Sequence, residues 1–126
     1  MKNSRKYLTS VIWVREALCA AGASYGQLGN FEDVELSIVP VAGNVYMVQR
    51  PGGGGNIGVL VGPEGVLLVD SLFAPLADKL VAVVKEVTDS EIRFLINTHV
   101  HIDHVGGNEN LAQMGVLIFA HENTRL

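Results

Sequence analysis

Three of the four histidines in this 126-residue chain, together with one aspartate, lie within six residues, at His99, His101, Asp103 and His104. Imidazole nitrogens and carboxylate oxygens are common zinc ligands. Alternate side chains of an extended backbone point to one side, so we expect His99, His101 and Asp103 to converge and His104 to point in a neighbouring direction. The natural division is two histidines for one metal ion and the Asp103–His104 pair for a second.

A purely structural role for this cluster is disfavoured because of the solvation energy it would cost. Three imidazoles and a carboxylate at the end of an apolar strand lose solvation without a packing gain unless a cation is bound there. Asp103 is the only carboxylate of the run, so we predict that it holds and steers the nucleophile besides binding metal. Gly106 and Gly107 follow directly and are expected to let the backbone bend tightly before the next helix.

The elements that position the cluster can be predicted from apolar periodicity and turn residues. The first part predicts an antiparallel meander, with a hairpin signal at Gly62–Gly65. Pro75 and the apolar spacing after it predict a helix, and residues 94–96, apolar throughout, predict a strand covered on both faces. The order β-β-β-β-α-β-α-β indicates a layered α/β (α+β) unit. Its strands are predicted at 34–41, 45–49, 57–61, 66–69, 93–97 and 116–120, and its helices at 75–87 and 108–114.

The run Thr98-His99-Val100-His101-Ile102-Asp103-His104-Val105-Gly106-Gly107-Asn108 resembles the T-H-x-H-x-D-H-x-G-G motif of the metallo-β-lactamase superfamily. Residues 65–71, ending in Asp70 and Ser71, resemble the strand that precedes this motif in the family. The resemblance covers residues 34–126 and implies the N-terminal half of an αβ/βα sandwich. It also implies two Zn²⁺ ions, with His99 and His101 binding the first and Asp103 and His104 the second.

The same resemblance implies that Asp70 orients a ligand histidine or supports the loop, in the outer shell of the metal site. The alternative is a strand-end aspartate that caps the turn at Ser71. His121 follows the last predicted strand, and we expect it to be a surface or outer-shell residue rather than a further ligand.

Family members take a third histidine, a bridging aspartate or cysteine and a last histidine from their C-terminal half, whereas this chain offers two ligands to each metal. A catalytic zinc normally has three protein ligands and a water. Three explanations follow: an incomplete gene, a half-domain that pairs with itself as a homodimer, or a non-functional remnant. Apolar strands left exposed favour aggregation, which disfavours a lone monomer.

The resemblance implies a zinc-dependent hydrolase in which a metal-bound hydroxide attacks a β-lactam, an ester or a related bond in a small-molecule substrate. Relatives with the same cluster also cut thioesters, lactones, sulfate esters and phosphodiesters. The alternative is a non-catalytic zinc-binding half-domain that self-associates. The turn Gly52–Gly55 is interpreted either as a mobile loop over the metal site or as a plain flexible turn.

Residues 1–23 predict a signal peptide, with a basic start and the small-x-small sequence Ala21-Gly22-Ala23, so we expect a periplasmic or secreted protein. Residues 24–33 are predicted to be a linker. The leader holds four of the nine basic residues and one of the thirteen acidic residues, so the remainder has a charge near −7, which disfavours nucleic acid as a partner. Nothing is expected to span a membrane after processing. Cys19 is the only cysteine, which excludes disulfides from the mature chain.

Overall fold

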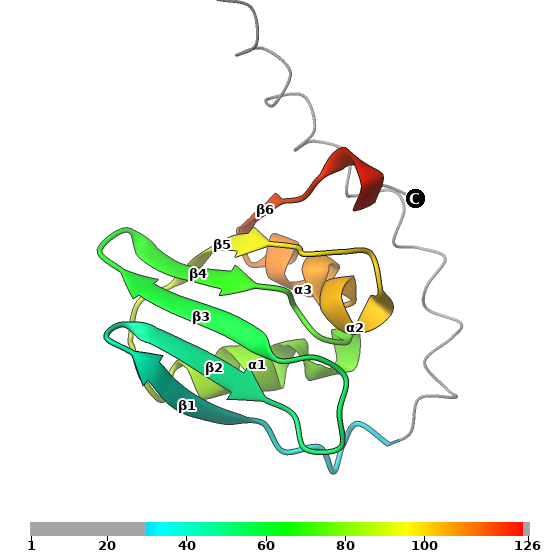
Figure 1. Ribbon diagram of the computed structural model, residues 1–126, viewed down its shortest axis with the longest axis horizontal. Helices are drawn as coiled ribbons and strands as arrows, with labels where there is room; N and C mark the ends of the chain where they lie inside the picture. The colour runs from blue at the N-terminus through cyan, green and yellow to red at the C-terminus, as the bar shows by residue number, and fades with distance from the viewer. Residues whose placement is uncertain (1–29, 125–126) are drawn as a thin grey trace, which may run out of the picture.

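The computed structural model describes residues 30–124. A single sheet of six strands in sequence order forms its centre (Figure 1). The first three pairings are antiparallel, and β4–β5 and β5–β6 are parallel. The strands are β1 (Ser37–Ala42), β2 (Val45–Gln49), β3 (Ile57–Gly62), β4 (Gly65–Val69), β5 (Ile92–Ile96) and β6 (Leu117–Phe119). The predicted antiparallel meander is present, and the strands that follow the first helix pair in parallel.

Each parallel strand is reached through helical structure. The short 3-10 helix η3 (Ala74–Leu76) contains Pro75 and runs into α1 (Ala77–Val84), which precedes β5. The helices α2 (Ile102–Val105) and α3 (Asn108–Gln113) lie between β5 and β6, and η4 (Glu122–Thr124) follows β6. None of the helices in residues 30–124 is long and apolar enough to cross a membrane. The predicted α/β layered fold is therefore confirmed, with α2 and η4 as additional elements.

The core lies between the helices and one face of the sheet. Alternate strand residues point into it, including Ile57 and Val59 on β3 and Leu68 on β4. Leu80 and Val84 of α1 and Leu111 of α3 are also buried there, and both helices lie on this side of the sheet (Figure 1). Full burial of each such side chain stabilises the fold by about 1.5–3 kcal/mol. This packing fixes the strands, and with them the strand ends that lead into the histidine cluster.

The opposite face of the sheet, called here the open sheet face, is also apolar. Cross-strand partners place Val45 beside Leu60 and Ile96 beside Phe119, with Leu117 next along β6. These five side chains are 37–52% exposed, and no helix of residues 30–124 covers them. The expectation that residues 94–96 are covered on both faces is therefore wrong for the described chain, because only Leu95 is fully buried.

The predicted signal peptide, residues 1–23, lies outside the described residues, as does most of the predicted linker. Of that linker, residues 30–33 are described and pack against the domain. The Phe31 ring lies 5.2 Å from the ring of Phe73. The Lys79 ammonium of α1 donates hydrogen bonds to the carbonyls of Phe31, Glu32 and Val34. The segment that leads into β1 is thus held to α1 by hydrogen bonds.

Candidate metal centre

The histidine cluster lies at the carboxyl ends of the two neighbouring parallel strands β4 and β5. Asp70 directly follows β4, and its amide donates to the carbonyl of Ile96 at the end of β5. Two left-handed residues, Asp70 (φ 69°) and Leu72 (φ 57°), then turn the chain beneath α2. Carboxyl ends of parallel strands commonly carry ligand sites, because the loops that leave them gather at one edge of the sheet.

The backbone of the cluster does not continue β5 as a strand, because the chain bends at Thr98 and Val100 before an extended conformation at His101. That residue has φ −62° and ψ 144° and precedes the single helical turn α2, which contains Asp103 and His104. The expectation that His99, His101 and Asp103 converge by strand alternation is therefore wrong. The helical turn brings His104 back towards His99 instead, and the two ring centroids lie 4.0 Å apart.

All four predicted ligands nevertheless form one contiguous group. The rings of His99 and His101 meet edge to face with centroids 4.8 Å apart. Asp103 Oδ2 lies 3.4 Å from His104 Nε2. His101 is exposed, and the side chains of His104 and Asp103 are partly buried. The described residues thus place His101, His99, His104 and Asp103 in a row, with His101 exposed and Asp103 partly exposed.

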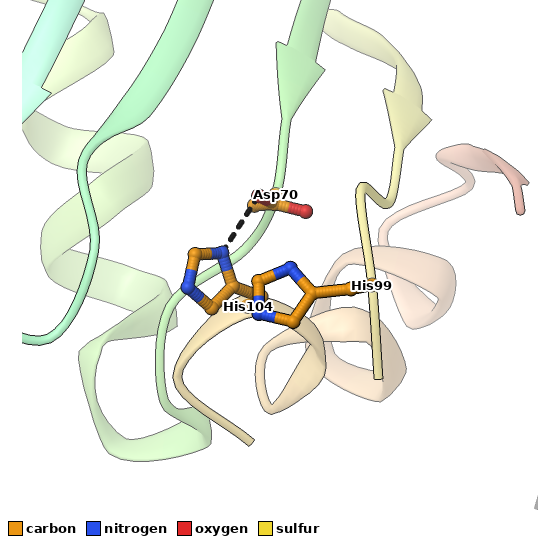
Figure 2. A group of neighbouring side chains, drawn as sticks. All are labelled: Asp70, His99 and His104. Atoms are coloured by element: carbon orange, nitrogen blue, oxygen red, sulfur yellow. Dashed lines mark hydrogen bonds and ion pairs between the residues drawn. The ribbon is translucent and has the colours of Figure 1, made fainter. Parts of the chain in front are cut away.

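Asp70 lies beside the rings of His99 and His104 and is hydrogen-bonded to His104 (Figure 2). One carboxylate oxygen accepts a 2.7 Å hydrogen bond from the Thr98 amide. The other accepts from the Thr98 hydroxyl and from His104 Nδ1, both at 2.7 Å. The Asp70 side chain is 4% exposed, so these three donors replace its water. Potential ligand atoms of Asp70, His99 and His104 all lie within 4.8 Å of one another.

These contacts fix which ring nitrogens carry protons. The Thr98 hydroxyl has one hydrogen, and a carboxylate can only accept, so that hydrogen goes to Asp70. The hydroxyl oxygen, 2.8 Å from His99 Nδ1, then accepts a hydrogen bond from the Nδ1–H group. His104 Nδ1 likewise donates to Asp70. Both imidazoles are thereby held with Nδ1–H occupied, which leaves both Nε2 lone pairs free to bind a metal.

A buried polar network beneath α2 was not predicted from the sequence. Asn97 and Asn108 exchange reciprocal side-chain hydrogen bonds of 3.1 and 2.7 Å, and the Ser71 hydroxyl lies 2.8 Å from Asn108 Oδ1. The His104 carbonyl accepts from Asn97 Nδ2 and from the Ser71 amide. Ser71 is fully buried, and Asn97 and Asn108 nearly so. The sequence feature that could have indicated this network is the position of these three polar residues at the ends of apolar elements.

Gly106 and Gly107 are required for close packing rather than for a bend. Their φ values, −59° and −81°, are ones that any residue adopts. A Cβ at Gly106 would lie 2.9 Å from the Leu72 carbonyl, and one at Gly107 would overlap the Ser71 carbonyl. The Gly107 amide donates to the Leu72 carbonyl at 3.0 Å. The expected tight bend is thus corrected: the glycines let α2 and α3 lie directly on residues 71–73.

The glycine turn between β2 and β3 reaches the cluster. A Cβ at Gly55 would lie 3.2 Å from His104 Cε1 and 3.3 Å from His104 Nε2, so the Gly55 backbone lies against the metal-facing edge of that ring. His121, in contrast, is exposed before η4, and its Nδ1 accepts from the Asn123 amide. It is absent from the group formed by Asp70, His99 and His104 in residues 30–124.

Comparison with known proteins identifies the arrangement. A model of the metallo-beta-lactamase superfamily matches residues 40–116. The solved mono-zinc form of the metallo-β-lactamase FIM-1 from Pseudomonas aeruginosa has 23% identity and a TM-score of 0.63, covering 73% of this chain and 44% of that one. A metallo-β-lactamase from Hirschia baltica has 28% identity and a TM-score of 0.59, with 71% and 45% covered. The comparison with curated proteins gave no significant match.

The fold is shared with enzymes of different substrates. The sec-alkyl sulfatase PisA1 aligns with a TM-score of 0.55 at 24% identity, covering 67% of this chain and 14% of that one. The chain spans less than half the length of the solved structures named here. The family match extends over more than half of the chain and includes the whole cluster from His99 to His104. This chain therefore belongs to the metallo-β-lactamase superfamily, as a partial domain of that fold.

Proposed function

We propose that the cluster is a binuclear zinc site for hydrolysis, with His99 and His101 binding one ion and Asp103 and His104 the other. The observation that carries this proposal is the hydrogen bonding that leaves Nε2 of both His99 and His104 free on the side of the cluster. A buried Asp70 that orients two imidazoles through their Nδ1 atoms is the usual outer support of a zinc-binding histidine.

The residues fit zinc in chemistry and in spacing. Two ligands on one tetrahedral zinc, at bond lengths of about 2.0–2.1 Å, stand about 3.3 Å apart. Asp103 Oδ2 and His104 Nε2 lie 3.4 Å apart, which supports their sharing one ion. The group contains imidazoles and carboxylates and no sulfur, a donor set that suits zinc.

Each residue would have a distinct task. Asp70 keeps Thr98 and His104 in fixed orientations, and Thr98 passes that constraint on to His99. Asp103, whose side chain is 27% exposed, offers a carboxylate that can orient an attacking water and hold its proton. Bound zinc would supply a water acidified to near-neutral pKa and a Lewis acid for the scissile bond. The substrate class we propose is a β-lactam or small ester, in keeping with the predicted export signal.

Turnover tests this proposal. The purified chain loaded with zinc should hydrolyse nitrocefin or a chromogenic ester, and removal of zinc by a chelator should abolish the rate and its return restore it. The reaction is followed by absorbance against a chelated sample. A chain that binds zinc at the cluster but hydrolyses neither substrate would contradict the enzymatic proposal and favour the candidate that follows.

The second candidate is a zinc-binding half-domain that self-associates, and the open sheet face favours it. Cross-strand neighbours there are apolar on β2, β3, β5 and β6, and none of its five members carries a charge. Contiguous exposed apolar surface of this kind marks an interaction site. Two copies could stack these faces as paired sheets do, about 10 Å apart. An isologous pair is the simplest closed assembly of this kind.

The mass of the chain in solution tests that candidate. We expect a dimer in light scattering after size exclusion. Replacing Leu117 and Phe119, 52% and 41% exposed, with lysine should shift it to monomer. The control is Met114→Lys, equally exposed at 52% but beyond the end of α3. A wild-type chain that is monomeric throughout, or a dimer unaffected by the double substitution, would exclude pairing through this face.

A further inference from the structure

We propose that Arg50 is a positioning residue that clamps the turn Gly52–Gly55, so that Gly55 forms a fixed wall beside His104. The consequence for metal binding rests on the proposed function, whereas the clamp itself does not. The proposal replaces both interpretations of this turn made from the sequence, a mobile loop over the site and a plain flexible turn.

The guanidinium of Arg50 lies against two aromatic rings. Its central carbon is 5.8 Å from the ring centroid of Phe31 and 5.2 Å from that of Phe73, within the range of cation–π attraction. The two rings also contact each other. Arg50 Nη1 donates to the Gly53 carbonyl, and the Gly53 amide donates back to the Arg50 carbonyl. The two rings therefore hold the guanidinium of Arg50 in place. Arg50 in turn holds the backbone of Gly53, through its Nη1 and through its own carbonyl.

Both rings are themselves anchored. Phe73 is buried and belongs to the core next to η3. Phe31 is held through its backbone, because Lys79 of α1 donates hydrogen bonds to its carbonyl and to that of Val34. The clamp is consequently attached to α1 and to the strand-end segment that begins at Asp70, the residue that hydrogen-bonds to His104.

The four glycines divide into two pairs under this clamp. All have φ between +81° and +96°, a conformation that strains any other residue. A Cβ at Gly52 or Gly53 would meet nothing within 4 Å. A Cβ at Gly54 would overlap Arg50 Nη1 and approach Phe73, and one at Gly55 would press on His104. Backbone strain is thus common to all four, while close contact of an added Cβ with Arg50, Phe73 or His104 is confined to the second pair.

Gly55 touches the Cε1–Nε2 edge of His104, and Nε2 is the nitrogen left free for metal. A wall at this position limits the directions in which the His104 ring can tilt, while Asp70 holds the same ring through a hydrogen bond to Nδ1. Loss of Arg50 would free the turn and leave His104 oriented by Asp70 alone. The His104 side of the cluster should then bind zinc more weakly, with folding of the sheet unaffected.

Amide hydrogen exchange and zinc titration of the full chain test the clamp. Arg50→Ala should raise exchange in residues 52–56 but leave β5 unchanged, and should weaken zinc binding by about tenfold. Arg50→Lys should restore little, because an ammonium lacks the planar face that stacks on rings. Phe31→Leu removes one ring of the clamp and serves as the second test if Arg50→Ala melts below the wild type.

A glycine pair provides the matched control. Gly55→Ala and Gly52→Ala impose similar backbone strain, but only the former contacts His104, so only the former should lower zinc affinity. Unchanged exchange of residues 52–56 in both Arg50→Ala and Phe31→Leu would overturn the clamp. Equal zinc affinity of the two glycine variants would overturn the wall. Should the wild type bind no zinc, the proposed function fails, and the exchange data still decide whether the clamp exists.

Discussion

Asp70→Asn should weaken zinc binding by about 10–100-fold and lower the free energy of unfolding by about 1–3 kcal/mol. Asparagine tolerates the left-handed backbone that Asp70 adopts, so the substitution leaves the turn unstrained. Its amide oxygen can accept on one side only, so it cannot accept all three hydrogen bonds that the carboxylate accepts. Whichever way the amide is oriented, an NH₂ group faces Thr98 or His104, and one buried donor loses its acceptor.

The measurements are a zinc competition titration and chemical unfolding, with Asp89→Asn as the control. Asp89 is exposed on the loop before β5, whereas the cluster follows the other end of that strand, so its amide variant should match the wild type in both. Wild-type zinc affinity in Asp70→Asn would show that Asp70 is a structural cap of its turn and takes no part in orienting the histidines.

Asp103→Asn should lower kcat by roughly 100-fold while changing the free energy of unfolding by less than about 0.5 kcal/mol. Asp103 is partly exposed, and among the described residues its one ion-pair-distance contact is with His104 Nε2, 3.4 Å away. Folding therefore depends little on its charge. Hydrolysis depends on it strongly, because the amide is a poor zinc ligand and cannot take a proton from the attacking water.

The substitution is assayed with the same chromogenic substrates as the wild type, at saturating zinc so that weakened affinity is not read as lost turnover. Glu109→Gln, an exposed acid at the start of α3, is the control and should retain full activity. Equal kcat in Asp103→Asn and the wild type would remove Asp103 from the chemistry and leave it as a replaceable ligand.

Residue types and short-range spacing predicted much of this molecule. The cluster from His99 to His104 is contiguous in sequence, so its membership did not depend on the fold. The meander was also local, since its strands are joined by short turns and pair with their neighbours. The helix predicted at 75–87 is present as η3 followed by α1 (Ala77–Val84), and the apolar spacing that predicted it buries Leu80 and Val84.

What sequence reasoning missed depends on contacts between distant segments or on elements too short for periodicity. The turn α2 has four residues, fewer than an apolar repeat needs to show a helical period. The resemblance implied that Asp70 orients a ligand histidine, but not that Asp70 also accepts hydrogen bonds from Thr98, 28 positions later in the chain. Asn97 and Asn108 were indistinguishable from ordinary strand-end and helix-start residues until the fold brought them together.

The glycine turn shows the same limit. Its composition predicted flexibility, and all four residues do adopt positive φ. Its contacts with Arg50 and His104, however, exist only because the segment at Phe31 and the segment at Phe73 meet on one side of the sheet. The composition of the turn indicates which backbone conformations are accessible to it, whereas its packing determines which conformation it adopts.

Zinc binding by the chain itself tests the central claim most directly. Titration against a chromogenic chelator should give two zinc ions per wild-type chain, and His104→Ala should lose one of them, since it removes the Nε2 that Asp70 holds in place. His121→Ala, a histidine exposed outside the cluster, should bind zinc as the wild type does. If His104→Ala and His121→Ala bind the same number of ions with the same affinity as the wild type, the cluster is not the metal site.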